Sequence, residues 1–138
     1  MLDDYLAAVL KKPWKWGAPD GVDCCTYVCG WALEATGKDV FAPYRGVYHN
    51  ARAARRLVAG RGGLAGILGK ELERCGFARV ETPEHGDIGI IATPEGGGNE
   101  SVFGASAVIR CANWWVGRGT GGLAGFDAPA IAIWRILA

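Results

Sequence analysis

The spacing of apolar residues divides the chain into a helical first half and a strand-rich second half. Apolar side chains that recur at intervals of three and four residues predict helices over residues 2–10, 24–36, 50–60 and 64–75. Short apolar runs between turn residues predict strands over residues 78–81, 86–94, 101–110 and 130–137. Helices followed by antiparallel strands are typical of the α+β class, here with N-terminal helices packed on a C-terminal antiparallel sheet.

Capping residues and glycines mark the boundaries of these elements. Asp23 is a good N-cap for the second helix, and Gly37 is a natural stop for it. Asn50 can cap the short basic helix that follows. Glycines cluster at residues 96–98 and again between residues 117 and 125, which predicts a turn or loop over residues 95–100 and a strand with a long loop over residues 111–127.

Length and charge narrow the class of protein. The chain has 138 residues, half of them hydrophobic, which suits a single domain over residues 1–138 with its own core. The net charge of +1 argues against electrostatic binding to nucleic acid or to a membrane surface. A local cluster of Arg52, Arg55 and Arg56 is interpreted as the solvated face of a helix, with a phosphate or nucleic-acid contact as the alternative.

The chain also lacks the sequence signals of membrane insertion and secretion. No apolar run approaches the ~18 residues that a membrane-spanning helix needs. The N-terminus is acidic first and basic afterwards, the reverse of the order in a signal peptide. We therefore expect a protein that is made in the cytoplasm without a signal peptide and does not insert into a membrane.

Cys24 is the first candidate for chemistry, because it follows a loop and begins the predicted helix. Free N–H groups and the helix dipole at such a position can stabilise a thiolate, the reactive form of cysteine. Buried, inert cysteines occupy the same kind of position, so the placement alone leaves both interpretations open.

The residues around Cys24 carry a family resemblance. The chain contains WKWGAPDGVDCCTYV and, tens of residues later, HGDIGII. These stretches resemble the NlpC-like cysteine peptidases, a papain-fold family that cleaves bacterial cell-wall peptides. In that family a Tyr-x-Trp-Gly-Gly loop leads to Asp-Cys-Ser-Gly at a helix start, Gly-Asp opens the first core strand, and a His begins the next strand. The resemblance covers roughly residues 13–113 and implies a papain-like fold.

The chain most resembles small phage and prophage proteins related to that family, which are tail-module proteins where a role is assigned. Those proteins share Asp-Cys, Arg-Gly-x-Tyr, Gly-Asp and a terminal Trp-Arg. The corresponding positions here are 23–24, 45–48, 86–87 and 134–135. The resemblance implies that Cys24 stands at the nucleophile position, next to Asp23, and that Asn113 falls near the polar residue that orients the family's histidine.

Three positions depart from the family pattern. Trp14 stands where the family has its active-site Tyr, and Gly17 is present where two glycines are expected. The strand that should begin with His reads SVFG over residues 101–104. A thiol needs a base to form the reactive ion pair and an acid for the leaving amine, and such help contributes roughly 10²–10⁴ in rate. The missing imidazole therefore indicates an incomplete site.

The two histidines of the chain are possible substitutes. His85 directly precedes the first core strand, and in a meander it should lie far from the start of the next strand. His49 lies in an irregular segment after the second helix, so a catalytic role for it stays open. A surface or capping role is the alternative for each histidine.

The remaining cysteines raise a third hypothesis. Cys25, Cys29, Cys75 and Cys111 could in principle hold zinc or an iron–sulfur cluster, but their spacing does not form a C-x-x-C knuckle. An odd number of cysteines in a chain without a signal peptide also argues against a disulfide framework. Small buried thiols that behave as apolar residues are the alternative, so we expect no cofactor.

Three functions are therefore compatible with the sequence. The leading interpretation is a structural or assembly component of a phage or prophage tail, near its tip, built on a degenerate peptidase scaffold and located in the virion. Its partners would be other phage tail proteins, and we expect no nucleic acid among them. The second is an active cysteine endopeptidase or amidase acting on peptidoglycan peptides, with Cys24 as nucleophile and His49 or a partner's histidine as base. The third is a tail protein with a metal or iron–sulfur site on its cysteines.

Overall fold

A computed structural model of the chain describes residues 1–17, 20–93 and 103–138. The helices in this part of the chain are α1 (Leu2–Leu10), α2 (Cys24–Thr36), the 3₁₀ helix η1 (Ala42–Tyr44), α3 (Ala51–Ala59) and α4 (Gly63–Arg74). The strands are β1 (Arg79–Val80), β2 (Ile88–Ala92), β3 (Ala105–Cys111), β4 (Trp114–Gly119), β5 (Gly122–Phe126) and β6 (Ala130–Trp134). The expected α+β class and the order of helices before strands are confirmed.

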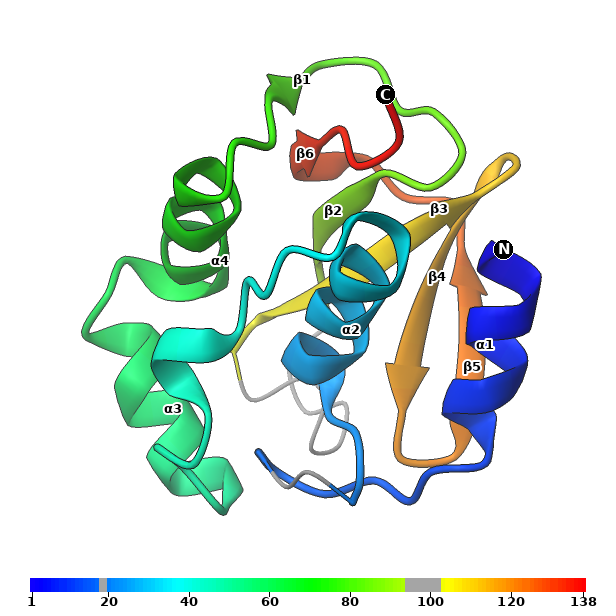
Figure 1. The fold of residues 1–138 in the computed structure, drawn as a ribbon. Coiled ribbons are helices and arrows are strands. Elements are labelled where there is room, and N and C mark those ends of the chain that lie inside the picture. Colours follow the sequence, from blue (N-terminus) through cyan, green and yellow to red (C-terminus); the bar gives the residue numbers. More distant parts are fainter. Residues whose placement is uncertain (18–19, 94–102) are drawn as a thin grey trace.

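The strands form one antiparallel sheet in the order β1-β6-β2-β3-β4-β5. Strands β2 to β5 are consecutive and make a meander, while β6 returns to pair with β2 on its other side. Figure 1 shows the helices on one face of this sheet, with α2 across its middle, α1 over β5, and α3 and α4 at the opposite side. No helix among the described residues is long and apolar enough to cross a bilayer.

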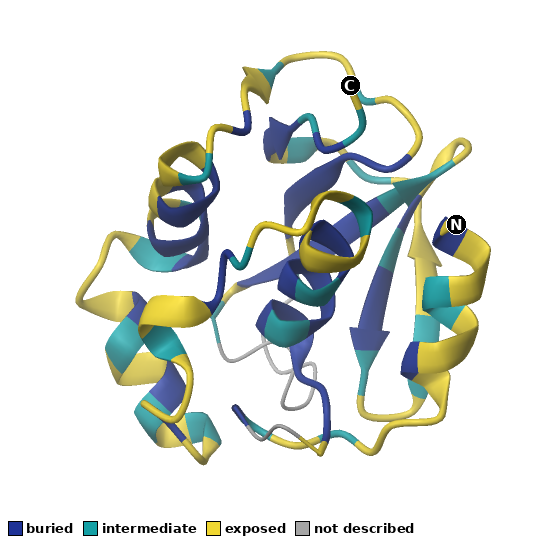
Figure 2. Cartoon of the chain, in the orientation of Figure 1, coloured by how far each residue is buried: buried dark blue, intermediate teal, exposed yellow. Residues whose placement is uncertain are grey.

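Apolar side chains are buried on both faces of the sheet, in two separate clusters. The larger cluster joins the helices to the inward-facing residues of the strands, and α2 lies at its centre, with Tyr27, Val28 and Trp31 fully buried. Figure 2 shows that the buried residues gather on α2 and on the strands behind it, while the outer sides of α1 and α3 are exposed. A smaller cluster lies on the other face and consists of Ile91, Val108, Trp115 and Ile133.

The glycine-rich segment over residues 111–127 differs from its prediction as one strand with a long loop. It contains two strands, β4 and β5, which pair with each other through a tight turn at Thr120 and Gly121. The sequence analysis predicted strands from short apolar runs between turn residues, whereas both strands of this hairpin contain glycines. Cross-strand packing explains the glycine at position 117. A Cβ atom there would lie 3.3 Å from Val108 Cγ1 and 3.4 Å from Phe126 Cε2, so a larger residue would crowd both side chains.

Two sequence motifs far apart in the chain meet in an ion pair at the start of β2. Asp87 is completely buried, and its Oδ1 accepts a hydrogen bond from Arg135 Nε at 2.9 Å. Its Oδ2 accepts another from the backbone N–H of Glu84 at 2.8 Å. The Gly-Asp and Trp-Arg pairs of the sequence therefore fasten the start of β2 to the end of β6.

The predicted turn over residues 95–100 and the first two positions of the strand predicted over 101–110 lie outside the described residues. Within the described part of that segment, β3 begins at Ala105.

Candidate functional site

The start of α2 is held by the carboxylate of Asp23. Asp23 Oδ1 accepts hydrogen bonds from the backbone N–H groups of Cys25 and Thr26, each at 2.9 Å. The Thr26 hydroxyl accepts a hydrogen bond from the Asp23 N–H at 2.8 Å, which completes a capping box. The N-cap role predicted for Asp23 is confirmed, and the side chain of Asp23 is fully buried as part of it.

The second oxygen of Asp23 gathers two further chain segments. Asp23 Oδ2 accepts a hydrogen bond from the Gly17 N–H at 2.8 Å and another from the Tyr48 hydroxyl at 2.8 Å. Gly17 has a φ of +65°, and a side chain on it would clash with the carbonyl oxygen of Tyr48. One carboxylate thus joins the loop before α2, the first turn of α2 and the segment that leads to α3.

Cys24 lies at the first position of α2 beneath this network, and its exposed fraction is 0%. The neighbouring Cys25 is buried too, and its interaction with Cys24, followed by burial, raises the pKa of Cys25 well above its ordinary value. Cys24 therefore occupies the predicted helix start, but it does so in the interior of the protein.

Neither histidine is hydrogen-bonded to Cys24. His49 is exposed and lies in the segment just before α3. His85 is also exposed, and its Nδ1 accepts a hydrogen bond from the Ala112 N–H at 3.2 Å, in the turn between β3 and β4. The chain has two histidines, and both are among the described residues, so no imidazole of this chain serves Cys24 as a base in this structure.

Asn113 lies at the opposite end of the sheet from Cys24. Trp31, two turns along α2 from Cys24, donates a hydrogen bond from Nε1 to the carbonyl oxygen of Gly86 at 2.8 Å. The Gly86 N–H in turn donates to the carbonyl oxygen of Arg110, near the end of β3. Asn113 follows in the exposed β3–β4 turn, at the upper end of the hairpin in Figure 1, whereas α2 begins at the lower end. The structure thus brings Asp23 and Cys24 together and leaves Asn113 apart from them.

An aromatic row lies beside the described part of residues 101–104, the segment in which the resemblance expects a histidine. Of residues 101–104, Ser101 and Val102 lie outside the described residues, and Phe103 is half-buried. The Phe103 ring packs edge-on against Trp16, which packs edge-on against Trp14, with centroid distances of 5.9 and 5.3 Å. In the described part of residues 101–104, Phe103 therefore packs against aromatic side chains.

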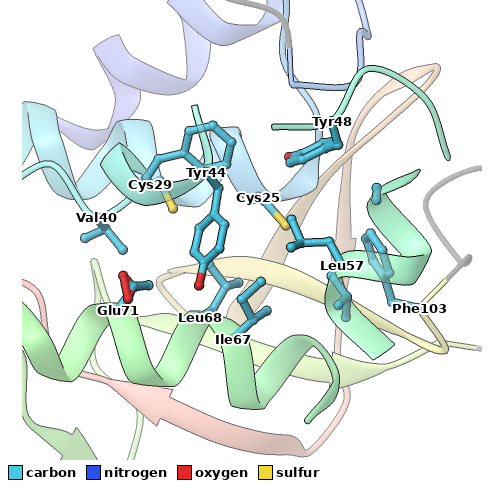
Figure 3. Close-up of a pocket in the computed structure, with 13 residues that line it drawn as sticks. Cys25, Cys29, Val40, Tyr44, Tyr48, Leu57, Ile67, Leu68, Glu71 and Phe103 are labelled. Carbon is cyan, nitrogen blue, oxygen red and sulfur yellow. The ribbon is translucent and has the colours of Figure 1, made fainter. Parts of the chain in front are cut away.

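A small apolar cavity lies beside α2 and opens next to Cys25. Its volume is about 20 Å³, close to the room that one or two water molecules need. Figure 3 shows Cys25 and Cys29, one helical turn apart, facing it from α2, with Tyr48 above and Leu68 and Glu71 of α4 below. A larger hollow of about 250 Å³ lies on the outer side of α2, against Gly17, Thr26 and Leu33. Cys24 lines neither space, so neither gives a substrate access to its sulfur.

The cysteines do not converge as metal ligands. All five are free thiols; Cys24, Cys25 and Cys29 are buried in α2, and Cys75 and Cys111 are half-buried elsewhere. Over residues 1–17, 20–93 and 103–138, no three side chains of His, Cys, Asp or Glu gather in a way that could hold a metal ion. The described residues thus offer no ligand set for zinc or an iron–sulfur cluster.

Two residues of the site had no predicted role. Tyr48 stands in the Arg-Gly-x-Tyr motif, but its contact with Asp23 spans 25 residues, and no local pattern signals such a contact. Glu71 is buried in the wall of the small cavity, where its Oε2 accepts a hydrogen bond from Arg74 Nε at 3.1 Å. Glu71 lies four residues after Ile67 and three after Leu68, on the apolar stripe of α4. This spacing is the sequence feature that could have predicted its burial.

The fold and the site define an α+β protein with a buried thiol at the capped start of its central helix. The chain belongs to the family described as Domain of unknown function (DUF6950), which it matches over residues 1–136. No curated protein and no solved structure matches the chain.

We expect the protein to lose stability in alkaline solution. Burial is the main cause that raises the pKa of Cys29, Tyr27 and Tyr48 above their ordinary values of 9.0 for cysteine and 10.0 for tyrosine. The unfolded chain releases these protons as the pH rises past those values, while the folded chain keeps them. The stabilisation is therefore complete below about pH 9 and declines above it, by up to about 1.4 kcal/mol per pH unit for each group.

Urea unfolding at a series of pH values from about 7.5 to about 11 measures this effect, with the pH range set by the ordinary pKa values. The urea midpoint should stay level at first and then fall, and it should fall less steeply in Tyr48→Phe. A midpoint that is unchanged up to the highest pH would contradict the burial of these groups.

Proposed function

We propose that this protein is a structural component of a bacteriophage or prophage tail, in the region of the tail tip, built on a papain-like scaffold of the NlpC type. The proposal combines the sequence resemblance with an α+β architecture in which helices cover one face of an antiparallel sheet. In this proposal the protein is part of the virion and its partners are other tail proteins.

One observation carries the choice of a structural over a catalytic role: the sulfur at the nucleophile position is inaccessible and has no base. Cys24 has an exposed fraction of 0%, and neither histidine of the chain is hydrogen-bonded to it. The surrounding residues instead use their polar groups to hold the loop, the helix start and Tyr48 together through Asp23. These contacts support the interpretation that the residues at the family's active-site positions hold three segments of the chain together.

An active peptidase acting on peptidoglycan peptides is the second candidate. The observation that favours it is the capped helix start, since the free N–H groups beside Cys24 would support a thiolate if the site opened. This function would require a base supplied by His49 after a rearrangement or by a partner chain.

The experiment is replacement of the natural copy by Cys24→Ala in a bacterium that produces the corresponding phage particles. The structural role predicts that the protein is present in purified particles and that tails of normal length and number form with Cys24→Ala. Absence of the protein from particles would refute the tail role. Normal incorporation of Cys24→Ala together with a loss of infection would favour the peptidase.

A further inference from the structure

The charges of this protein are strongly segregated along the chain. Residues 40–70 contain six of the 15 Lys and Arg residues and none of the 14 Asp and Glu residues. The remainder of the chain therefore has an excess of negative charge, which brings the whole molecule to a net charge of only +1. The positive charge is confined to one region, formed mainly by α3 and its flanking turns.

Three arginines of α3 face the same side. Arg52, Arg55 and Arg56 are separated by three and four residues, so they lie on one arc of the helix, opposite the buried Ala54 and Val58. All three side chains are exposed, as is Arg61 just beyond the helix. In the part of the chain that the structure describes, none of these four arginines forms a salt bridge. We call these four residues the basic patch.

The arrangement is unfavourable for the folded chain by itself. Like charges three and four residues apart on a helix repel each other. Arg52 also lies in the first turn of α3, where the positive end of the helix dipole disfavours cations, whereas Arg56 lies in the last turn, where a cation is favoured. The adjacent cap, Asn50, is neutral, and no carboxylate occurs within the helix to offset them. An external anion would relieve this repulsion.

The shape of the patch favours a short anionic segment. From Arg52 to Arg56 the helix advances only about 6 Å. Arg61 extends the patch just past the end of α3. In Figure 1, α3 lies at the corner of the molecule away from α1 and β5, where a partner can approach it. Guanidinium groups bind carboxylates through paired hydrogen bonds, which makes arginine better suited than lysine to a geometrically defined carboxylate partner.

We propose that the basic patch is a docking surface for an acidic segment of another protein, with two to four carboxylates paired to Arg52, Arg55, Arg56 and Arg61. Single-stranded nucleic acid fits less well, since α3 has no aromatic side chain on which bases could stack, and the Tyr44 ring beside the patch is already covered by the Arg61 guanidinium, 5.8 Å from its centroid. A membrane fits less well too, because none of the large exposed apolar side chains of the described residues lies on α3. The inference relies on the proposed assembly role only for its choice of a protein as the partner.

The test is direct binding of a fluorescein-labelled peptide of ten glutamates to the full chain, measured by fluorescence anisotropy. One variant combines Arg52→Gln, Arg55→Gln and Arg56→Gln. The matched control combines Lys11→Gln, Lys12→Gln and Arg79→Gln, which removes the same charge from exposed positions elsewhere. We expect at least tenfold weaker binding in the patch variant and less than about threefold in the control, since a local patch acts over about a Debye length.

The stability of the patch variant provides a second readout. Because glutamine removes like-charge repulsion without exposing any buried group, the thermal midpoint should stay level or rise. A substantial fall would mean that the arginines are needed for the fold and would overturn the proposal.

Three binding results would also overturn it. The wild-type chain could fail to bind the peptide, or both triple variants could lose affinity equally, which would reduce the effect to net charge. A single-stranded DNA with the same number of charges, or vesicles of an anionic phospholipid, could bind more tightly than the peptide and with the same dependence on the patch. Failure of this test leaves the proposed role in tails standing, since that role is measured by incorporation into particles.

Discussion

Replacing Asp23 with alanine is expected to lower the free energy of unfolding by about 3–7 kcal/mol. Loss of the N-cap accounts for about 1 kcal/mol of this, and the N–H of Gly17 and the hydroxyl of Tyr48, left without an acceptor in the interior, for about 1–3 kcal/mol each. Such a loss is a large share of the roughly 5–15 kcal/mol that stabilises a typical domain. Urea unfolding followed by circular dichroism measures it.

Two variants separate the parts of this effect. Asp20→Ala removes an exposed carboxylate from the same loop, one that pairs with Lys15 at the surface, and should leave stability nearly unchanged. Tyr48→Phe removes one hydrogen bond to Asp23 and should produce an intermediate loss. If Asp23→Ala unfolds at the same urea concentration as Asp20→Ala, the carboxylate does not join the three segments as described.

Gly17→Ala is expected to destabilise the protein by about 2–5 kcal/mol. The residue has a φ of +65°, which disfavours any side chain by about 1–2 kcal/mol, and the new methyl group would also clash with the Tyr48 carbonyl oxygen. Displacing a backbone in a packed interior adds about 1–3 kcal/mol. Because the clash pushes Tyr48 away from Asp23, the variant should also expose Cys24 more often.

Gly46→Ala is the matched control for this prediction. Gly46 has a similar φ of +77°, but a methyl group on it would meet nothing within 4 Å. It should show only the conformational penalty of about 1–2 kcal/mol, so the difference between the two variants isolates the clash. Equal thermal midpoints for Gly17→Ala and Gly46→Ala would show that the loop before α2 yields without strain.

The helices were predicted accurately because their signals are local. Asp23 and Gly37 bound α2 at the expected positions, and Asn50 caps α3 by accepting the N–H of Ala53 at 2.8 Å. A capping residue contacts only the first three or four residues of its helix, so the local sequence is enough to predict where the helix begins.

The sheet and the site were predicted only in part, since their determinants are contacts across the chain. The β4–β5 hairpin contains glycines whose use depends on neighbouring strands, such as Gly117 opposite Val108. At the site, the sequence indicated Asp23 and Cys24, which are adjacent. It gave no indication that Tyr48 would reach Asp23, and it left open whether Cys24 would be buried or reactive, because both depend on packing between distant segments.

The most direct test of a structural rather than catalytic Cys24 is its reaction with iodoacetamide in the native protein, read for each cysteine by peptide mass spectrometry. The half-buried Cys75 and Cys111 should react first. Cys24 should react at least ~100-fold more slowly than in the urea-unfolded chain, since its reaction must await an opening of the structure. Rapid labelling of Cys24 ahead of the other cysteines would contradict this and would indicate an accessible, activated thiol.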